Sequence, residues 1–242
     1  FVASEVIAAA TNIPGQTGNA GKYLKTDGTN ARWEYSGFGR NLLINSDFAI
    51  NQEEYASGVI TTGEYGHDMW KSISSASYTV SSGALTLVSG TLGQRNDDLI
   101  AADGETVTIS ITSGSLTIGA TAGAASTVVT AGSPYSWTLD MSGSAFVTIT
   151  AATSAYGIKI ERGSAATAYS VPESASEENR CFRYFYKCGG EGVSGVATRL
   201  TSTAKLVTVP IPVEMRAAPT ATINALYVLN YNDSTGEIFT AS

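Results

Sequence analysis

The residues that could carry acid–base chemistry in this chain are few and scattered. His67 is the single histidine, so any scheme in which a histidine activates a serine must use it. Asp68 could orient the His67 ring, but the Gly-x-Ser-x-Gly turn that often presents such a serine does not occur. We therefore interpret His67 as a turn residue ahead of a strand that begins near Trp70.

Paired carboxylates would be needed to cleave a glycosidic bond, with the two carboxyl groups about 5–9 Å apart. Glu53-Glu54 and Asp97-Asp98 are adjacent pairs, and on a strand the two members of each pair would point to opposite faces. Glu177-Glu178 falls in the first turn of an expected helix, where the helix dipole favours acids. Asp103 could join Asp97 and Asp98 around calcium, but no 12-residue calcium loop supports this. We expect no catalytic residue, no metal and no cofactor.

Aromatic side chains offer a different chemistry, because pyranose faces stack on rings while neighbouring polar groups bond the sugar hydroxyls. Tyr135 and Trp137 would share one face of a strand. Tyr55 and Tyr65 lie in a segment with glycines and are expected at the surface. These four residues are the candidate ligand-binding residues, and ordinary packing within a strand is the alternative for Tyr135 and Trp137.

The charge of the chain limits its partners. The 242 residues carry a formal net charge of −7, and only 14% are Asp, Glu, Lys or Arg, against about 25% in ordinary globular proteins. The 14 basic residues are scattered, so we expect neither nucleic acid nor an anionic membrane surface as a partner. No apolar run approaches the roughly 20 residues of a membrane span, so no membrane insertion is expected. Ser, Thr, Gly and Ala are abundant, which is typical of sheets with hydroxyl-rich exposed faces.

Short strands separated by Gly and Ser predict a β-sandwich or jelly roll over residues 40–172. Val107, Ile109 and Ile111 alternate with Thr and Ser, which is the period of a half-buried strand. The expected strands are 77–80, 84–88, 106–112, 115–121, 126–130, 135–140, 145–151 and 156–161.

Shorter elements are expected on both sides of this domain. Asp27-Gly28 between two short β runs predicts a hairpin of strands over 22–26 and 31–35. A two-stranded hairpin cannot bury its own apolar side chains, so we expect copies from neighbouring chains to cover them; a flexible linker is the alternative. Ser174 and Glu177 fit a capping box, which predicts a helix over about 175–184. Strands over 205–211 and 220–230 would follow.

The two cysteines are expected to be free. Cys181 and Cys188 are seven residues apart, which on a continuous helix places them two turns apart on one face, too far for a disulfide. Free thiols fit a protein assembled in a reducing cytoplasm and released by lysis rather than by secretion.

Several segments, in the same order along the chain, resemble motifs of bacteriophage tail fibre proteins. Ser46 stands where that family has Gly, and Met69 where it has Arg. The matching segments are NAGKYLKTDGTNARWEY (19–35) with GxxGKxLxTDGTxxxWA, RNLLINSDFAINQ (40–52) with NLLxNGDFxIxQ, GHDMW (66–70) with xADRW, GETVTISI (104–111) with GKTVTLSF, IKIERG and the residues to 189 with LExG, xATPFE and ExxRCQRYYY, and VPIPVEMRAAPT (209–220) with VPxPVxMRAxPT.

The resemblance implies a homotrimeric, non-catalytic virion protein that recognises polysaccharide or a surface protein on the host cell. Residues 1–39 would be a stalk and collar joined to other tail proteins, 40–172 a jelly-roll domain, and 173–242 an α+β distal domain that continues beyond this chain. The side chains expected to pack between subunits or domains are Tyr23, Leu24, Trp33, Phe182, Tyr184 and Tyr186.

Two other functions remain open at this point. A secreted carbohydrate-binding module of a glycan-active enzyme would share the jelly-roll opening, although the collar motif and the RCFRYFYKCG block disfavour it. A glycan-cleaving tailspike usually needs a long β-helix, and no β-helix repeat occurs in the sequence.

Overall fold

The computed structural model describes residues 14–17, 22–26, 31–35, 39–187, 196–199, 205–208 and 210–220. The chain divides into two compact units, Phe1–Glu177 and Glu178–Ser242. Within the described ranges the regular structure is antiparallel β-strand apart from two short helices, so the mainly β fold class is confirmed.

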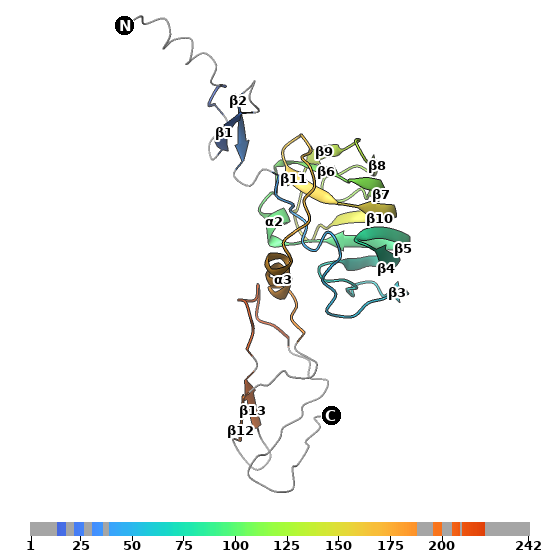
Figure 1. Cartoon of the computed structure of the whole chain (residues 1–242), viewed down its shortest axis with the longest axis vertical. Helices are drawn as coiled ribbons and strands as arrows, with labels where there is room; N and C mark the ends of the chain where they lie inside the picture. Colours follow the sequence, from blue (N-terminus) through green and yellow to red (C-terminus); the bar gives the residue numbers. More distant parts are fainter. Residues whose placement is uncertain are drawn as a thin grey trace, which may run out of the picture. The chain divides into compact units, whose positions relative to one another are not determined.

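Two sheets make up most of the first unit (Figure 1). The larger sheet has the strand order β3-β4-β5-β10-β7-β8, and the smaller has the order β11-β6-β9. The bounds are β3 (Val59–Ile60), β4 (Lys71–Ser81), β5 (Ala84–Gln94), β6 (Thr106–Ser110), β7 (Ser113–Ile118), β8 (Thr127–Thr130), β9 (Tyr135–Thr138), β10 (Val147–Tyr156) and β11 (Lys159–Arg162).

One hydrophobic core serves both sheets, which gives the unit a β-sandwich-like arrangement. Leu85 and Leu116 on the larger sheet and Ile109 and Ile160 on the smaller sheet are at most 1% exposed and belong to a single cluster. Each such side chain contributes about 1.5–3 kcal/mol by leaving water. The alternation read in the sequence around Ile109 is therefore the pattern that points β6 towards this core.

Every strand predicted over 77–161 overlaps an observed strand, but β4 and β5 are longer than expected. The prediction ended β5 at Val88, because Ser89-Gly90 reads as a turn. Gly90 instead lies in a bulge, with φ of +76° and no room for a side chain, since an added Cβ would lie 2.1 Å from the Ser74 carbonyl oxygen. The strand continues past this point to Gln94.

A short helix, α2 (Asp97–Ile100), follows β5 and was not predicted. The Asn96 side chain caps it by accepting a hydrogen bond from Leu99 N at 2.9 Å. Asp97 and Asp98 lie in its first turn, so the expectation of a strand at this pair is wrong. The dipole favours acids at that end of a helix, and Asp98 also pairs with Arg40 at 2.9 Å.

The predicted hairpin is confirmed as β1 (Lys22–Thr26) and β2 (Ala31–Tyr35), which form a two-stranded sheet. Leu24 lies directly opposite Trp33 in its register. The predicted helix is α3 (Ser174–Phe182). In the described part of the second unit, β12 (Val196–Arg199) pairs with β13 (Lys205–Thr208). The strand expected over 220–230 lies outside the described residues, apart from Thr220.

Candidate functional site

A groove of about 320 Å³ lies in the first unit, and five of its ten lining residues carry a hydroxyl group. Three segments distant in sequence meet there: the end of β6, the turn between β8 and β9, and the loop after β11. Its volume falls at the small end of the range for ligand pockets, about 300–1,000 Å³. The lining residues are Ser110, Ile111, Thr112, Thr130, Gly132, Pro134, Ala166, Thr167, Ala168 and Tyr169.

A buried ion pair holds the loop that forms one wall of this groove. Lys159 and Glu161 project from the same face of β11, are 2% and 0% exposed, and approach to 3.3 Å. Glu161 accepts hydrogen bonds from Thr167 N at 2.6 Å and from Thr167 Oγ1 at 2.7 Å. Lys159 Nζ donates to Thr167 Oγ1 at 2.5 Å and to Ala168 O at 3.1 Å. Two charges buried in this way are tolerated because each is paired and hydrogen-bonded.

Tyr169 closes the groove next to a glycine that leaves it room. Gly157 has φ of +67°, and an added Cβ would lie 2.3 Å from Thr112 Oγ1 and 3.2 Å from the Tyr169 ring. The Tyr169 hydroxyl lies 3.4 Å from Ser46 Oγ, and its ring meets Tyr156 edge-on. Burial raises the pKa of Tyr169, so the phenol stays protonated at neutral pH. The groove can thus form neutral hydrogen bonds and ring contacts, but its lining residues offer no charged group.

The single histidine lies in a packed aromatic cluster rather than in the groove. His67 N donates to Tyr78 Oη at 2.8 Å, and His67 Nδ1 lies 3.0 Å from the same oxygen. Burial lowers the pKa of His67, and the neighbouring Asp68 offsets this only in part. Tyr78 is fully buried, and burial raises its pKa. The imidazole is therefore neutral at physiological pH, and it packs within this aromatic cluster.

The opening motif of the first unit is built around buried amides. Asn45 donates to Ile50 O at 2.7 Å and to Asp68 O at 2.9 Å, and it accepts from Ile50 N. Trp70 Nε1 donates to Asn45 O at 2.8 Å, and the Trp70 ring stacks on Phe48 at 4.8 Å. Asp68 is held by Gln52, both through the backbone N at 2.8 Å and through the side-chain amide. These contacts give Asn45, Gln52 and Asp68 structural roles.

The candidate tyrosines of the 55–65 segment lie in different surroundings. Tyr55 is half-buried, its ring is 4.7 Å from that of Tyr78, and its hydroxyl is 2.8 Å from Gly58 O. Tyr65 is 51% exposed, with Lys71 Nζ 5.7 Å from the centre of its ring. Tyr65 therefore offers a ring to solvent, and Tyr55 packs against the core.

Tyr135 and Trp137 do share a face of β9, as predicted, and their rings stack at 5.5 Å. Trp137 is 7% exposed and donates to Ala122 O at 3.0 Å, and the Tyr135 hydroxyl accepts from Ala125 N at 3.1 Å. The stack packs against the core beneath the 122–125 loop. This geometry agrees with the alternative of packing within a strand.

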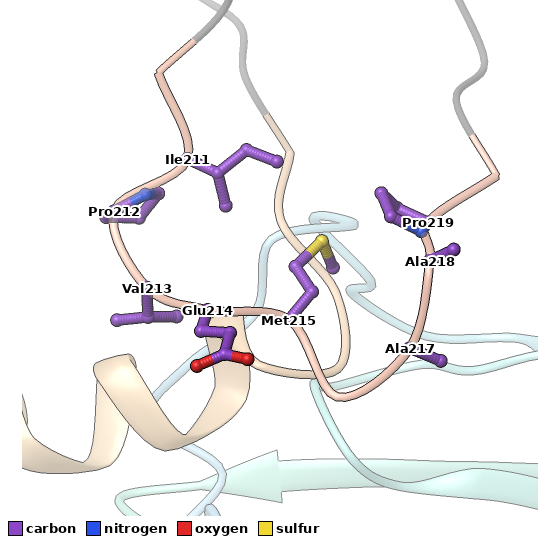
Figure 2. A pocket seen from close by; sticks show the side chains of 8 residues that line it. All are labelled: Ile211, Pro212, Val213, Glu214, Met215, Ala217, Ala218 and Pro219. Carbon is purple, nitrogen blue, oxygen red and sulfur yellow. The ribbon is translucent and has the colours of Figure 1, made fainter.

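In the second unit, residues 211–219 form a loop that borders a shallow, open hollow of about 500 Å³, lined mostly by apolar side chains. Figure 2 shows Ile211 and Met215 pointing into the space between the two arms of this loop, with the Pro219 ring on the opposite arm. Ile211 is 47% exposed. Arg216 N donates to Arg183 O at 2.9 Å, and the Arg216 guanidinium lies 5.9 Å from the Tyr184 ring.

The residues predicted to pack between subunits have mixed surroundings. Leu24 is 42% exposed, Trp33 is half-buried and donates to Pro14 O at 2.9 Å, and the Tyr23 side chain lies outside the described residues. Phe182 and Tyr186 meet edge-on at 5.1 Å. Cys181 is buried and forms no disulfide, and Cys188 lies outside the described ranges.

Acidic, histidine and cysteine side chains do not gather into a possible metal site anywhere in the part of the chain that the structure describes. In that same part, neither helix is long and apolar enough to span a membrane.

Comparison with protein-family models, with curated proteins and with solved structures finds no match for this chain.

The groove itself was not predicted from the sequence. Tyr169 was not among the candidate ligand-binding residues, and Ser110, Thr112 and Thr130 were expected only as strand residues. The available signal was weak: the buried strand carries Lys159 and Glu161 at alternate positions, an unusual choice for a core strand. Charges at such positions indicate that a polar loop covers the strand.

Proposed function

We propose that this chain belongs to a homotrimeric phage tail fibre that binds a glycan or a protein on the host cell surface without cleaving it. The observation that carries the proposal is the β1–β2 hairpin. Its cross-strand pair Leu24 and Trp33 leaves Leu24 42% exposed on a two-stranded sheet. An isolated hairpin of this kind is marginal in water, and two further copies of the chain would cover its apolar face.

Motif order supports the same proposal. The hairpin, the opening motif, the β6 strand, the segment around Glu161 and the loop around Arg216 all resemble tail fibre motifs. In four of them the structure gives the key residues internal roles: Asn45 and Trp70 lock the opening loop, Ile109 packs in the core, Glu161 clamps the groove loop, and Arg216 packs on Tyr184. We place other tail proteins on the N-terminal side, with assembly in the host cytoplasm.

Ligand binding is assigned to the first unit, because its groove presents neutral hydroxyl groups and a tyrosine ring on a loop held from beneath. Three sites in one trimer would strengthen a modest single-site affinity through effective concentration. No covalent step is needed for this role.

Adhesion to cells tests the proposal. Fluorescently labelled chain is incubated with a panel of bacterial strains, with and without surface polysaccharide extracted from each strain. We expect saturable binding to a subset of strains, blocked by extracted polysaccharide where the receptor is a glycan. Binding to none of the strains, or equal binding to all of them, would contradict the proposal.

A secreted carbohydrate-binding module is the second candidate. The groove with hydroxyl groups on a β-sandwich-like unit supports this function as well as it supports a tail fibre. The two candidates differ in assembly. A module of that class would bind its polysaccharide as a monomer, whereas a tail fibre would be a trimer.

A further inference from the structure

The outer face of the larger sheet is almost free of charge. Its six strands contain one charged residue, Lys71, which lies at one end of β4 beside the Tyr65 and Phe146 rings. Ordinary globular proteins carry about 25% charged residues. Hydroxyl side chains are frequent on this face, which also exposes Val88 and Val128, so the face is neutral and partly polar.

These hydroxyls form a row that crosses the strands and begins at the groove. Thr130, which lines the groove, lies opposite Ser115 on β7, and Ser115 lies opposite Thr153 on β10. The row continues on β5 with Thr86, whose hydroxyl accepts from Ser154 N at 3.2 Å, and Thr86 lies opposite Thr79 on β4.

Burial of the neighbouring residues fixes the face on which this row lies. Leu85 and Leu87 flank Thr86 and are buried, and Ala152 next to Thr153 is buried as well. Alternate residues of a strand point to opposite faces, so Thr86 and Thr153 both point away from the core. Directly opposite residues share a face, which places the other members of the row on the outside too.

We propose that this row and the groove together bind an uncharged polysaccharide that lies across the strands. The proposal rests on the function proposed above and names its ligand class. Neighbouring strands are about 4.8 Å apart, which is close to the repeat of pyranose units along a glycan chain. Each strand crossed would therefore present one hydroxyl to about one sugar unit, and the groove would hold the terminal unit against Tyr169.

A neutral glycan fits this surface better than a second copy of the chain does. Protein interfaces are depleted in Ser and enriched in aromatic residues, Met and Arg, and the row contains none of the enriched types. An acidic glycan would meet no cation along the row, since Lys71 lies at the far end of β4 from Thr79. Neutral hydroxyls can donate to and accept from sugar hydroxyls in either direction.

The test uses the full chain and an array of bacterial surface polysaccharides with neutral or acidic repeat units, followed by calorimetric titration of each polysaccharide bound. The variant T130V/S115A/T153V removes three hydroxyls and keeps β-branched residues at the two threonine positions. T106V/T138V is the matched control, because these threonines are exposed and paired on the smaller sheet. T130V alone serves if the triple variant folds poorly.

We expect binding to neutral polysaccharides, weakened about 2- to 10-fold by T130V and about 10- to 100-fold by the triple variant, with the control within twofold of the wild type. Binding only to acidic polysaccharides, or undiminished binding by the triple variant, would overturn the inference and leave the adhesin function standing. Adhesion to cells without binding to any polysaccharide would also overturn the inference. A change in the native mass of the triple variant would do the same, because it would assign the row to contacts between chains. Absence of both cell and polysaccharide binding would overturn the proposed function as well.

Discussion

The β-sandwich-like sheets and the β1–β2 hairpin are both antiparallel, yet they meet the need to bury apolar side chains in opposite ways. In the sandwich, Trp70 is 1% exposed, stacks on Phe48 and donates its indole N–H to Asn45. In the hairpin, Leu24 faces Trp33 across two strands and stays 42% exposed. The Trp70 side chain is thus covered within one chain, whereas the Leu24 side chain is not.

If the proposed trimer forms, this difference separates the interactions that stabilise the fold from those that hold the chains together. Loss of a sandwich side chain should cost folding free energy, whereas loss of a hairpin side chain should change the number of chains that associate. The variants below test this division, beginning with the largest expected effect on the free energy of unfolding.

The substitution Trp70→Ala should be the most damaging, with a loss of about 3–5 kcal/mol in the free energy of unfolding. It opens a cavity at a fully buried site and leaves the Asn45 carbonyl without the indole donor. Urea unfolding followed by far-UV circular dichroism measures the loss. A cost below about 1 kcal/mol would show that the sandwich core does not depend on this residue.

Lys159→Met should cost about 3 kcal/mol, because it leaves the buried Glu161 carboxylate without its cation. The double variant K159M/E161L should recover much of that loss, since it removes both charges. The same urea titrations compare the two variants with the wild type. Equal losses in both would contradict the ion pair as the clamp of the groove loop.

The pH dependence of stability should depend on His67. Burial holds its pKa below the ordinary 6.5 in the folded chain, so the unfolded chain binds a proton first as the pH falls. The contribution of His67 to the free energy of unfolding is therefore fully present above about pH 6.5. Below that pH it declines, by at most about 1.4 kcal/mol per pH unit. Unfolding at pH 7.5, 6.5 and 5.5 should show a steeper decline for the wild type than for His67→Gln. Parallel declines would exclude His67 as the source.

Trp33→Ala should have the smallest effect on unfolding of the sandwich, under about 0.5 kcal/mol, since Trp33 is half-buried on the hairpin and does not belong to the sandwich core. Its effect should instead fall on assembly, with trimers giving way to smaller species. Leu24→Ser should act in the same direction, and Thr138→Val, on the smaller sheet, is the control. Trp33→Ala chains that remain fully trimeric would remove the hairpin from the subunit interface.

Local sequence patterns predicted those elements whose signals lie in neighbouring residues. The alternation around Ile109 and the Asp27-Gly28 turn each specify their own strand or hairpin, and both elements are present. The four-residue helix α2 is too short for a helical period, and Gly90 resembles a turn although it lies in a bulge. The bulge at Gly90 is decided by the facing strand β4, which a local pattern does not contain.

The groove could not be predicted from the sequence, because it depends on contacts between segments that are distant along the chain. Thr112, Thr130 and Tyr169 belong to three segments that only the folded sheets bring together. Aromatic residues were the natural sites to name, but Trp137 and Tyr55 turned out to pack against the core. Residue type alone does not separate a packed ring from an exposed one, whereas the register and burial of the strands do.

Native mass in solution tests the central claim most directly. Light scattering from the purified chain should give three copies of the 25.1 kDa chain, about 75 kDa, if the hairpin is a subunit collar. A stable species of 25.1 kDa over a wide range of concentration would contradict the trimer and favour a monomeric carbohydrate-binding module instead.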